Sequence, residues 1–289
     1  MTHSMLAPAK INLALHVTGR RADGYHLLES LVVFAAFGDR LSVAAAASDS
    51  VSVDGPHGAG LPTDAGNLVV AARDRLRAAF GADATPPVAI RLDKHLPVAS
   101  GIGGGSSDAA ATLKMLAAHW HLDAASPEIA AIAAMLGADV PMCLDGRALL
   151  ARGIGHDLQP LEAWPGFDVV LVNPGVAVST PAVFSKLSRR DNPPLPPLPA
   201  APDRPAALAF LAAARNDLET PARALAPEIS AALDALGSAG ARFARMSGSG
   251  ATCFGIFDDC AEAQAAADRI RSDRPGWFVV PTRTTGAGS

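Results

Sequence analysis

Hydrophobic and polar residues alternate most clearly near the start of the chain, over residues 10–17. Every second position there is aliphatic, and Lys10 and Asn12 fall on the positions between. Successive side chains of a strand point to opposite faces, so the pattern predicts a strand with Lys10 and Asn12 on a shared face. Lys10 is then either an ordinary solvated lysine at a strand start or a cation aimed into a site.

The pattern changes character near residue 160. Before it, strands at 31–37 and 40–45 are expected to form a hairpin that turns at Gly38-Asp39. The other elements expected in this part are a short strand within 48–63, strands at 88–92 and 147–151, and helices at 67–80, 109–120 and 126–137.

After residue 160 the order is strand, helices, strand, strand, helix, strand. This succession predicts an antiparallel sheet with helices on one face. The proline-dense segment 192–205 is expected to be an irregular loop. The expected fold class is therefore α+β, with residues 1–160 and 161–289 as two domains.

A glycine-rich stretch separates the strand at 88–92 from the helix at 109–120. Four glycines fall between residues 101 and 105, so the backbone is permissive and a ligand can approach its amides closely. A helix N-terminus, capped by Ser106 or Ser107, adds partial positive charge behind them. The stretch predicts a phosphate cradle, although a flexible loop before a helix is the plainer interpretation.

Two better-known phosphate motifs fit this stretch poorly. A P-loop ends in Gly-Lys-Ser/Thr, and Gly104-Gly105-Ser106 lacks the lysine. The dinucleotide fingerprint needs a third glycine where Ser106 stands. Neither a Walker-type nor a Rossmann site is therefore expected.

The composition narrows the class of protein. The chain has 289 residues, 49% of them hydrophobic, and a net charge of -4 without a basic block, which argues against a nucleic-acid partner. Its three cysteines are too few for a disulfide framework and lack metal-ligand spacing, so reduced thiols in the cytoplasm are expected. No apolar run reaches about 20 residues, the length of a membrane span. Lys10 interrupts the first apolar segment, unlike a signal peptide.

Two further residues, Asp139 and Tyr25, each have two possible roles. Asp139, in Gly137-Ala138-Asp139-Val140-Pro141, either caps a short helix or acts as a general base. Tyr25 is the only tyrosine of the chain, and in the loop-like segment 19–26 it is either a ring packed on the surface or part of a site.

Three separated segments together resemble the GHMP kinases, the small-molecule kinases that include galactokinase, homoserine kinase and mevalonate kinase. They are Pro8-Ala9-Lys10-Ile11-Asn12-Leu13, the stretch at 96–110, and Ser247-Gly248-Ser249-Gly250-Ala251. The resemblance implies two α+β lobes, an N-terminal lobe like domain 2 of ribosomal protein S5 and a ferredoxin-like C-terminal lobe. ATP and substrate would meet in the cleft between the lobes.

Further strings narrow the resemblance to one branch of these kinases. The most diagnostic are Asp23-Gly24-Tyr25-His26 and the Gly-Ala-Asp-Val-Pro string around Asp139. The branch transfers the γ-phosphoryl group of ATP to the tertiary 2-hydroxyl of a methylerythritol unit carried on cytidine diphosphate. This is a step of the non-mevalonate (methylerythritol phosphate) pathway of isoprenoid precursor biosynthesis. The resemblance implies this small-molecule substrate for a cytoplasmic monomer or homodimer, without a nucleic-acid or membrane partner.

The resemblance assigns the catalytic roles to Lys10 and Asp139. Asp139 accepts the proton of the attacking hydroxyl, while Lys10 keeps Asp139 ionised and offsets charge on the transferred group. A tertiary alcohol is a hindered nucleophile, and phosphoryl transfer depends mainly on alignment and charge stabilisation. The pair therefore suits the reaction.

The resemblance also divides the remaining site residues between ATP and the acceptor. The ATP set comprises Pro97, Val98, Ala99, Ser100, Gly101, Ile102, Gly103, Gly104, Gly105, Ser106 and Ser107, with Asn67 and Lys94 on the adenine side. Mg²⁺ is expected to be held mainly through the ATP phosphates. The acceptor set comprises Asn12, Tyr25, His26, Thr180, Pro181 and Phe184. In this set the rings of Tyr25 and Phe184 stack on the base and His26 bonds its edge.

Three other functions stay open at this point. A kinase of the same fold for mevalonate, homoserine or a sugar is disfavoured by the Asp-Gly-Tyr-His string. A non-catalytic nucleotide sensor is disfavoured because Lys10 and Asp139 both stand in their motifs. An RNA-binding module, suggested only by the S5-like lobe, is disfavoured by the acidic balance of the chain.

Overall fold

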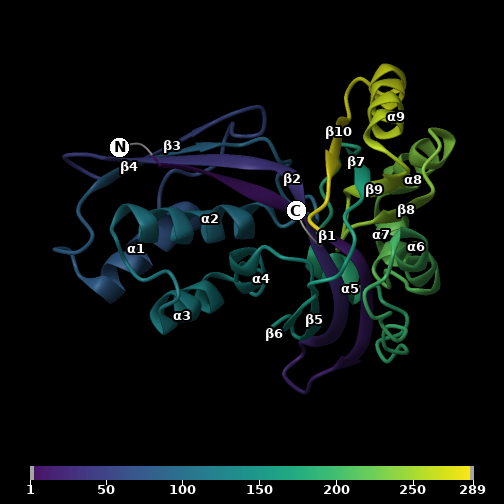
Figure 1. The fold of residues 1–289 in the computed structure, drawn as a ribbon, viewed down its shortest axis with the longest axis horizontal. Coiled ribbons are helices and arrows are strands. Elements are labelled where there is room, and N and C mark those ends of the chain that lie inside the picture. The colour runs from purple at the N-terminus through teal and green to yellow at the C-terminus, as the bar shows by residue number, and fades with distance from the viewer. Residues whose placement is uncertain (1–2, 287–289) are drawn as a thin grey trace. The chain divides into compact units, whose positions relative to one another are not determined.

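The computed structural model describes residues 3–286, shown in Figure 1. This part of the chain divides into two compact units. The first comprises residues up to 9, 37–98 and 103–146, and the second comprises residues 10–36, 99–102 and 147 onward. The N-terminal segment and the glycine-rich stretch each contribute to both units, and the sequential boundary at residue 160 stays a prediction.

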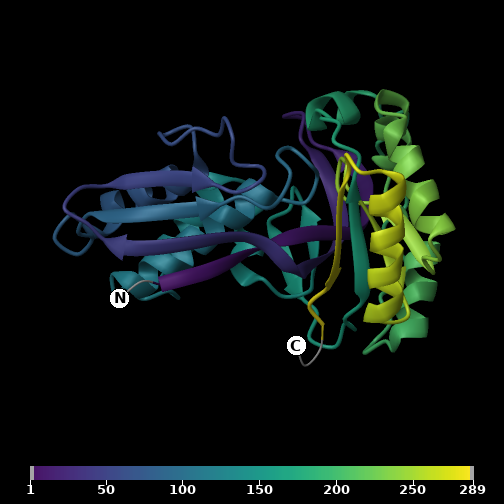
Figure 2. The same cartoon turned by 90° about the horizontal axis from the view of Figure 1, so that it is seen from above.

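The first unit packs helices on one side of a short sheet (Figures 1 and 2). The helices are α1 (Leu68–Phe80), α2 (Gly104–His119), α3 (Pro127–Leu136) and α4 (Val140–Asp145). The sheet comprises β3 (Ser50–Asp54), β4 (Val88–Asp93) and the last part of β2 (His26–Ala45). β4 pairs in parallel with β3 and antiparallel with β2. Alternate residues of β4 are buried, as expected for a strand covered on one face.

The predicted hairpin at Gly38-Asp39 is wrong, because β2 runs unbroken from His26 to Ala45. Position 38 needs glycine for close packing, since a Cβ atom there would lie 2.0 Å from the carbonyl oxygen of Ala7. Asp39 is fully buried and accepts hydrogen bonds from the amides of His95 (2.6 Å) and Leu96 (2.7 Å). Both residues therefore serve contacts that are distant in sequence.

The predicted serine cap of α2 is also wrong. The helix begins at Gly104 rather than at residue 109, and its N-cap is Gly103 with φ 64°, a left-handed conformation that glycine adopts without steric strain. Ser106 and Ser107 lie inside the first turn, and the Ser107 hydroxyl donates to the Pro8 carbonyl (2.6 Å). The last part of the glycine-rich stretch is therefore already helical.

The second unit contains the expected four-stranded antiparallel sheet. In spatial order its strands are β10 (Phe278–Arg283), β7 (Asp168–Asn173), β9 (Cys253–Phe257) and β8 (Phe243–Met246). This is the ferredoxin-like order, and it confirms the predicted architecture of this part. Helices α8 (Glu228–Ser238) and α9 (Cys260–Asp273) pack against one face of the sheet (Figure 2).

The same unit includes six further elements within residues 3–286. They are β1 (His3–Arg20) from residue 10 onward, β5 (Leu149–Gly153), β6 (Asp157–Pro160), α5 (Thr180–Ser185), α6 (Arg204–Ala213) and α7 (Glu219–Leu225). β5 pairs with the first part of β2, and β6, which the pattern did not predict, pairs with β5. Residues 192–203 form neither helix nor strand, as their proline density predicts. The predicted loop 192–205 is wrong at its end, because α6 begins at Arg204 and takes Pro205 into its first turn, where proline is tolerated. No helix within residues 3–286 is long and apolar enough to span a bilayer.

Candidate active site

β1 carries the first predicted site residues, Lys10 and Asn12, on a face that is buried rather than solvated. Lys10 is 6% exposed and Asn12 4% exposed, because both faces of the strand are covered by protein. Lys10 is therefore not the solvated lysine of the plainer interpretation. Its backbone N–H donates to the carbonyl of Ile102 (2.9 Å), which bonds β1 to residues 99–102, the tip of the cradle.

The C-terminal glycine motif, residues 247–251, holds the same tip. The Ser247 hydroxyl donates to the Gly101 carbonyl (3.1 Å) and accepts the N–H of Asn12 (3.0 Å). Gly101 has φ 77°, and a Cβ there would lie 2.7 Å from the carbonyl oxygens of Ser247 and Gly250, so glycine is required. Parts of all three segments that resemble the GHMP kinases therefore meet around Ser247.

The side-chain amide of Asn12 has a fixed orientation. Its Nδ2 donates to the Ser30 hydroxyl (2.7 Å), which in turn donates to the Ala14 carbonyl (2.7 Å). Because Ser30 has already used its proton, it can only accept from Asn12, and this assigns the nitrogen to the Ser30 side. The Oδ1 atom of Asn12 points away from Ser30 and is buried without a hydrogen-bond partner among residues 3–286. An unsatisfied buried acceptor suits a ligand that brings a donor.

Sequence reasoning missed Ser30. Its only signal is a hydroxyl at the edge of the apolar run at residues 31–35, and a polar residue that is buried inside a strand needs a partner. The partner lies on β1, 18 positions away in sequence, so the pattern of β2 alone does not reveal it.

The rings on the acceptor side lie in the second unit. His26 begins β2 and stacks on Phe184 of α5, with ring centroids 4.6 Å apart and an interplanar angle of 24°. The Nε2 atom of His26 is buried and has no partner in the part of the chain that the structure describes. Burial lowers the pKa of His26, and the guanidinium groups of Arg20 and Arg190 lower it further. The ring is therefore neutral at pH 7 and offers one donor and one acceptor.

The other acceptor-side residues are exposed. Tyr25 is 63% exposed in the turn before β2. Thr180 is the first residue of α5, and its hydroxyl lies 2.7 Å from that of Ser249, which links α5 to the C-terminal glycine motif. Pro181 follows in the first turn of α5. Helix α5 therefore carries Thr180, Pro181 and Phe184, and it brings Phe184 to His26.

Asp139 lies in the first unit, directly before α4. It occupies the N-cap position, but its side chain makes no capping hydrogen bond with α4. The capping interpretation is therefore wrong, since the helix begins without the help of this carboxylate. The general-base interpretation stays a prediction, which substitution of Asp139 tests directly.

The two residues assigned to the adenine side have protein partners in the first unit. The Oδ1 atom of Asn67 accepts the Val69 N–H in the first turn of α1 (3.0 Å), and its Nδ2 donates to a main-chain carbonyl (2.8 Å). Lys94 is buried and pairs with Asp39 and with Asp108 (2.7 Å). Contacts of Asn67 and Lys94 with ATP stay predictions.

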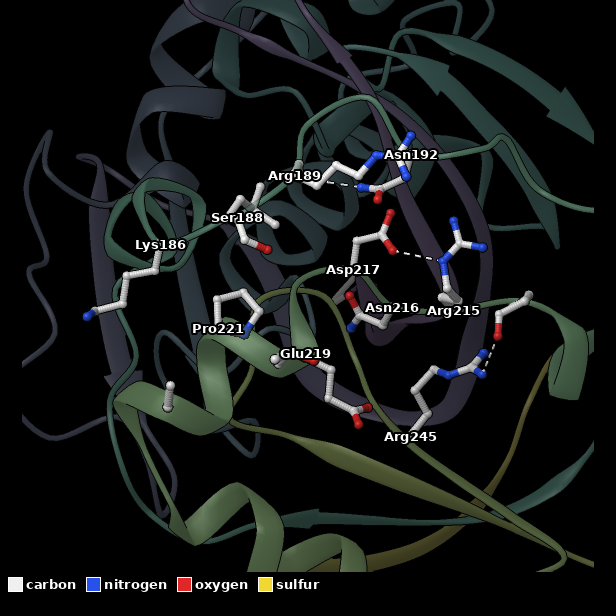
Figure 3. Close-up of a pocket in the computed structure, with 14 residues that line it drawn as sticks. Lys186, Ser188, Arg189, Asn192, Arg215, Asn216, Asp217, Glu219, Pro221 and Arg245 are labelled. Carbon is white, nitrogen blue, oxygen red and sulfur yellow. Dashed lines mark hydrogen bonds and ion pairs between the residues drawn. The ribbon is translucent and has the colours of Figure 1, made fainter.

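A pocket of about 680 Å³ in the second unit contains none of the predicted site residues (Figure 3). Asn216 lies on its wall and donates to the carbonyls of Met246 (2.8 Å) and Gly248 (2.9 Å). These bonds hold the entry to the C-terminal glycine motif. The sequence pattern, which placed residue 216 next to a predicted helix start, did not indicate this role.

Three charged side chains of this pocket, those of Arg215, Asp217 and Arg245, bind protein partners. Asp217 pairs with Arg215 (3.0 Å), as Figure 3 shows, and also accepts the N–H of Val17 (2.8 Å). Arg245 donates to three main-chain carbonyls, and burial lowers the pKa of this guanidinium to about 10. The pocket wall therefore supports β1 and the C-terminal glycine motif.

Comparisons with known proteins identify the family. The models described as GHMP kinases N terminal domain and GHMP kinases C terminal match residues 67–147 and 201–275. The 4-diphosphocytidyl-2-C-methyl-D-erythritol kinase of Mesorhizobium japonicum is 56% identical over 96% of this chain and 94% of its own. That of Sinorhizobium medicae is 53% identical over 98% of this chain and 95% of its own.

Solved structures agree with these matches. A crystal structure of 4-(cytidine 5'-diphospho)-2C-methyl-D-erythritol kinase is 36% identical, with a TM-score of 0.81 over 98% of this chain and 100% of that one. The L. major mevalonate kinase is 16% identical, with a TM-score of 0.69 over 100% of this chain and 98% of its own, and shares the fold. The chain therefore belongs to the GHMP kinase family, in the branch of the 4-diphosphocytidyl-2-C-methyl-D-erythritol kinases.

Proposed function

We propose that this chain transfers the γ-phosphoryl group of ATP to the tertiary 2-hydroxyl of 4-diphosphocytidyl-2-C-methyl-D-erythritol. The enzymes of that name in Mesorhizobium japonicum and Sinorhizobium medicae are 56% and 53% identical to it. The observation that carries the acceptor assignment is the stack of His26 on Phe184, with Nε2 of His26 buried and unsatisfied among residues 3–286. Cytosine offers both a face for stacking and an edge with donors and acceptors.

Asp139 and Lys10 perform the chemistry in this proposal. Asp139 accepts the proton of the attacking hydroxyl, and Lys10 offsets negative charge on the phosphoryl group during transfer. The buried Oδ1 of Asn12 accepts a hydrogen bond from a hydroxyl of the methylerythritol unit, which satisfies an atom that has no partner within residues 3–286. These contacts align the nucleophile, and alignment is the main requirement of phosphoryl transfer.

The cradle, residues 97–107, holds the triphosphate in this proposal. Because α2 begins at Gly104, its first amides and the positive end of its dipole favour the phosphate oxygens. Mg²⁺, held mainly through the ATP phosphates, would neutralise part of their charge. We place the enzyme in the cytoplasm as a monomer or homodimer, without a nucleic-acid or membrane partner.

A coupled ADP-release assay tests the proposed function. The reaction contains ATP and Mg²⁺ with the cytidylylated methylerythritol, mevalonate, homoserine or galactose as the acceptor. We expect turnover with the cytidylylated substrate alone. Turnover with another acceptor would refute the assignment of His26 and Phe184, and clear ATP binding without turnover on any acceptor would favour the sensor.

Loss of the Tyr25 ring is expected to weaken the acceptor and spare ATP. Stacking of an aromatic ring on a base contributes about 1–3 kcal/mol, so Tyr25→Ala should raise the KM of the acceptor roughly tenfold. The KM of ATP should stay near its original value. Tyr25→Phe, which keeps the ring, is the matched control in the same steady-state assay. An equal rise of both KM values in Tyr25→Ala would indicate a folding defect instead.

Loss of the Ser30 hydroxyl is expected to weaken the same substrate through Asn12. In Ser30→Ala the Asn12 amide loses the acceptor that fixes its orientation, and one such hydrogen bond is worth about 1 kcal/mol. The KM of the acceptor should therefore rise about fivefold, with the KM of ATP unchanged. Ser42→Ala makes the same substitution on the same strand outside the site. If Ser30→Ala and Ser42→Ala have indistinguishable kinetics, Ser30 does not position Asn12.

A further inference from the structure

A buried cluster of three ionisable residues, Asp39, Lys94 and Asp108, lies in the first unit at both ends of the cradle. The Lys94 ammonium pairs with Oδ2 of Asp39 and with Oδ2 of Asp108 (2.7 Å). The side chains of the three residues are at most 5% exposed. The cluster comes from three elements, since Asp39 is on β2, Lys94 follows β4 and Asp108 is on α2.

The cluster holds the chain where it enters the cradle. The second oxygen of Asp39 accepts the N–H groups of His95 (2.6 Å) and Leu96 (2.7 Å), the two residues that precede Pro97. Both oxygens of this buried carboxylate are thus bound by protein donors, one by the ammonium and the other by two main-chain N–H groups. Asp39 therefore fixes the backbone at the start of the cradle.

The cluster also holds the chain where it leaves the cradle. Lys94 reaches Asp108 in the first turns of α2, and a Cβ at Gly104 would lie 3.0 Å from its Nζ. The ammonium therefore lies directly under the first turn of the helix, whose amides close the cradle. One lysine, oriented by Asp39, connects the two ends of the phosphate-binding stretch.

The raised pKa of Asp108 gives the cluster one carboxylate, one ammonium and one neutral acid at pH 7. Burial raises the pKa of Asp108 to about 8. The Lys94 ammonium lowers this pKa, and the neighbouring Asp39 carboxylate raises it. The Oδ1 atom of Asp108 has no donor within residues 3–286, which also favours the neutral acid. Burial alone lowers the pKa of Lys94, but Asp108 and Asp39 reverse the direction and keep it charged. The other titratable groups that face the cluster are His57 and His95, and His95 pairs with Asp93 (3.0 Å).

We propose that the Asp39–Lys94–Asp108 cluster is a positioning unit for ATP, which sets the separation of the two ends of the cradle and leaves the acceptor side untouched. The inference rests on the proposed function only in taking ATP as the ligand of the cradle. It makes Asp39 the decisive residue, because Asp39 alone bonds both to Lys94 and to the entering backbone.

The test is a set of direct ATP-binding measurements by calorimetry in the absence of acceptor, followed by steady-state kinetics. In Asp39→Asn the amide oxygen can still accept from the backbone, but the ionic link between Lys94 and the entering backbone is lost. We expect the Kd and KM of ATP to rise about tenfold, the scale of one lost charged hydrogen bond. The KM of the acceptor should stay the same, and kcat at saturating ATP should change much less than the KM of ATP.

Asp49→Asn is the control for loss of an ion pair outside the cluster. Asp49 is half-buried, pairs with Arg77 and accepts the Val88 N–H (2.9 Å), so like Asp39 it joins one cation to a main-chain donor, but away from the cradle. It should lower the unfolding temperature without changing the Kd of ATP. If Asp39→Asn raises both KM values equally, or leaves the Kd of ATP unchanged, the inference is overturned.

The pH dependence of ATP binding gives a second readout that does not need the Asp39 variant to fold. Because burial raises the pKa of Asp108 to about 8, the cluster gains a negative charge beside the cradle as pH rises through that range. We expect ATP affinity to fall above about pH 8 in the unsubstituted protein, and the decline to be absent in Asp108→Asn. The same decline in both proteins would refute the charge scheme. Because ATP binding is measured without acceptor, these results stand apart from failure of the proposed acceptor.

Discussion

Asp139→Asn is expected to lower kcat about 100-fold or more, the usual scale for loss of a general base, while the protein still folds and binds both substrates. The amide keeps the size and shape of the carboxylate, but it cannot accept the proton of the attacking hydroxyl. The fold should survive because Asp139 makes no capping bond to α4. The measurements are kcat by ADP release, the Kd of each substrate by calorimetry, and the midpoint of thermal unfolding.

A control separates loss of a base from loss of a helix cap. The side chain of Asp259 accepts the Glu262 N–H (2.8 Å) and caps α9, so Asp259→Ala should lower the free energy of unfolding by about 1 kcal/mol and leave kcat unchanged. Asp139→Asn should instead lower kcat and leave the free energy of unfolding nearly unchanged. Near-normal turnover in Asp139→Asn would remove this residue from the proposed role.

Helix starts and strands with a regular pattern could be predicted from the sequence because their signals are local. Ser126 before Pro127 predicted the start of α3, and the structure confirms that the Ser126 hydroxyl accepts the Ile129 N–H (3.3 Å). The strand and helix order after residue 160 likewise gave the antiparallel sheet. In these elements each residue is placed by neighbours within a few positions, so local propensity and tertiary structure agree.

The failures occurred where a residue serves a distant contact. Gly38-Asp39 looks like a turn, but Gly38 packs on β1 and Asp39 bonds to the residues that lead into the cradle. Ser106 and Ser107 look like helix caps, but Gly103 takes that position. In each case the local sequence motif is present, but a tertiary contact determines the structure that it adopts.

The candidate site was recognised by motif, while the residues that hold it in place were not. Lys10, Asn12 and Asp139 stand in strings that resemble a family, but Ser30 and Asn216 stand in no such string. Their roles depend on hydrogen bonds to β1 and to the C-terminal glycine motif. Such partners become visible only once the chain is folded, because nothing in the spacing of the residues encodes them.

Lys10→Met is expected to lower kcat by about 100-fold, comparable with removal of one group that stabilises the transition state. Methionine fills a similar volume in a site where lysine is only 6% exposed, so packing of β1 should be retained. The KM of each substrate should change far less than kcat, because the charge of Lys10 matters most during transfer. Lys114→Met removes a half-buried ammonium outside the predicted site and should leave kcat unchanged.

The double variant Lys10→Met, Asp139→Asn then tests whether the two residues act together. Lys10 lies in the second unit and Asp139 in the first. Kinetic measurements on the working enzyme test whether the two residues cooperate. If Lys10 supports Asp139 and the same phosphoryl group, the second substitution should add little to the first, because residues that act as a unit are strongly non-additive. Independent roles would instead multiply the two losses, to about 10,000-fold for two losses of about 100-fold each. That outcome would leave each residue catalytic and would refute the pairing of base and cation on which the mechanism rests.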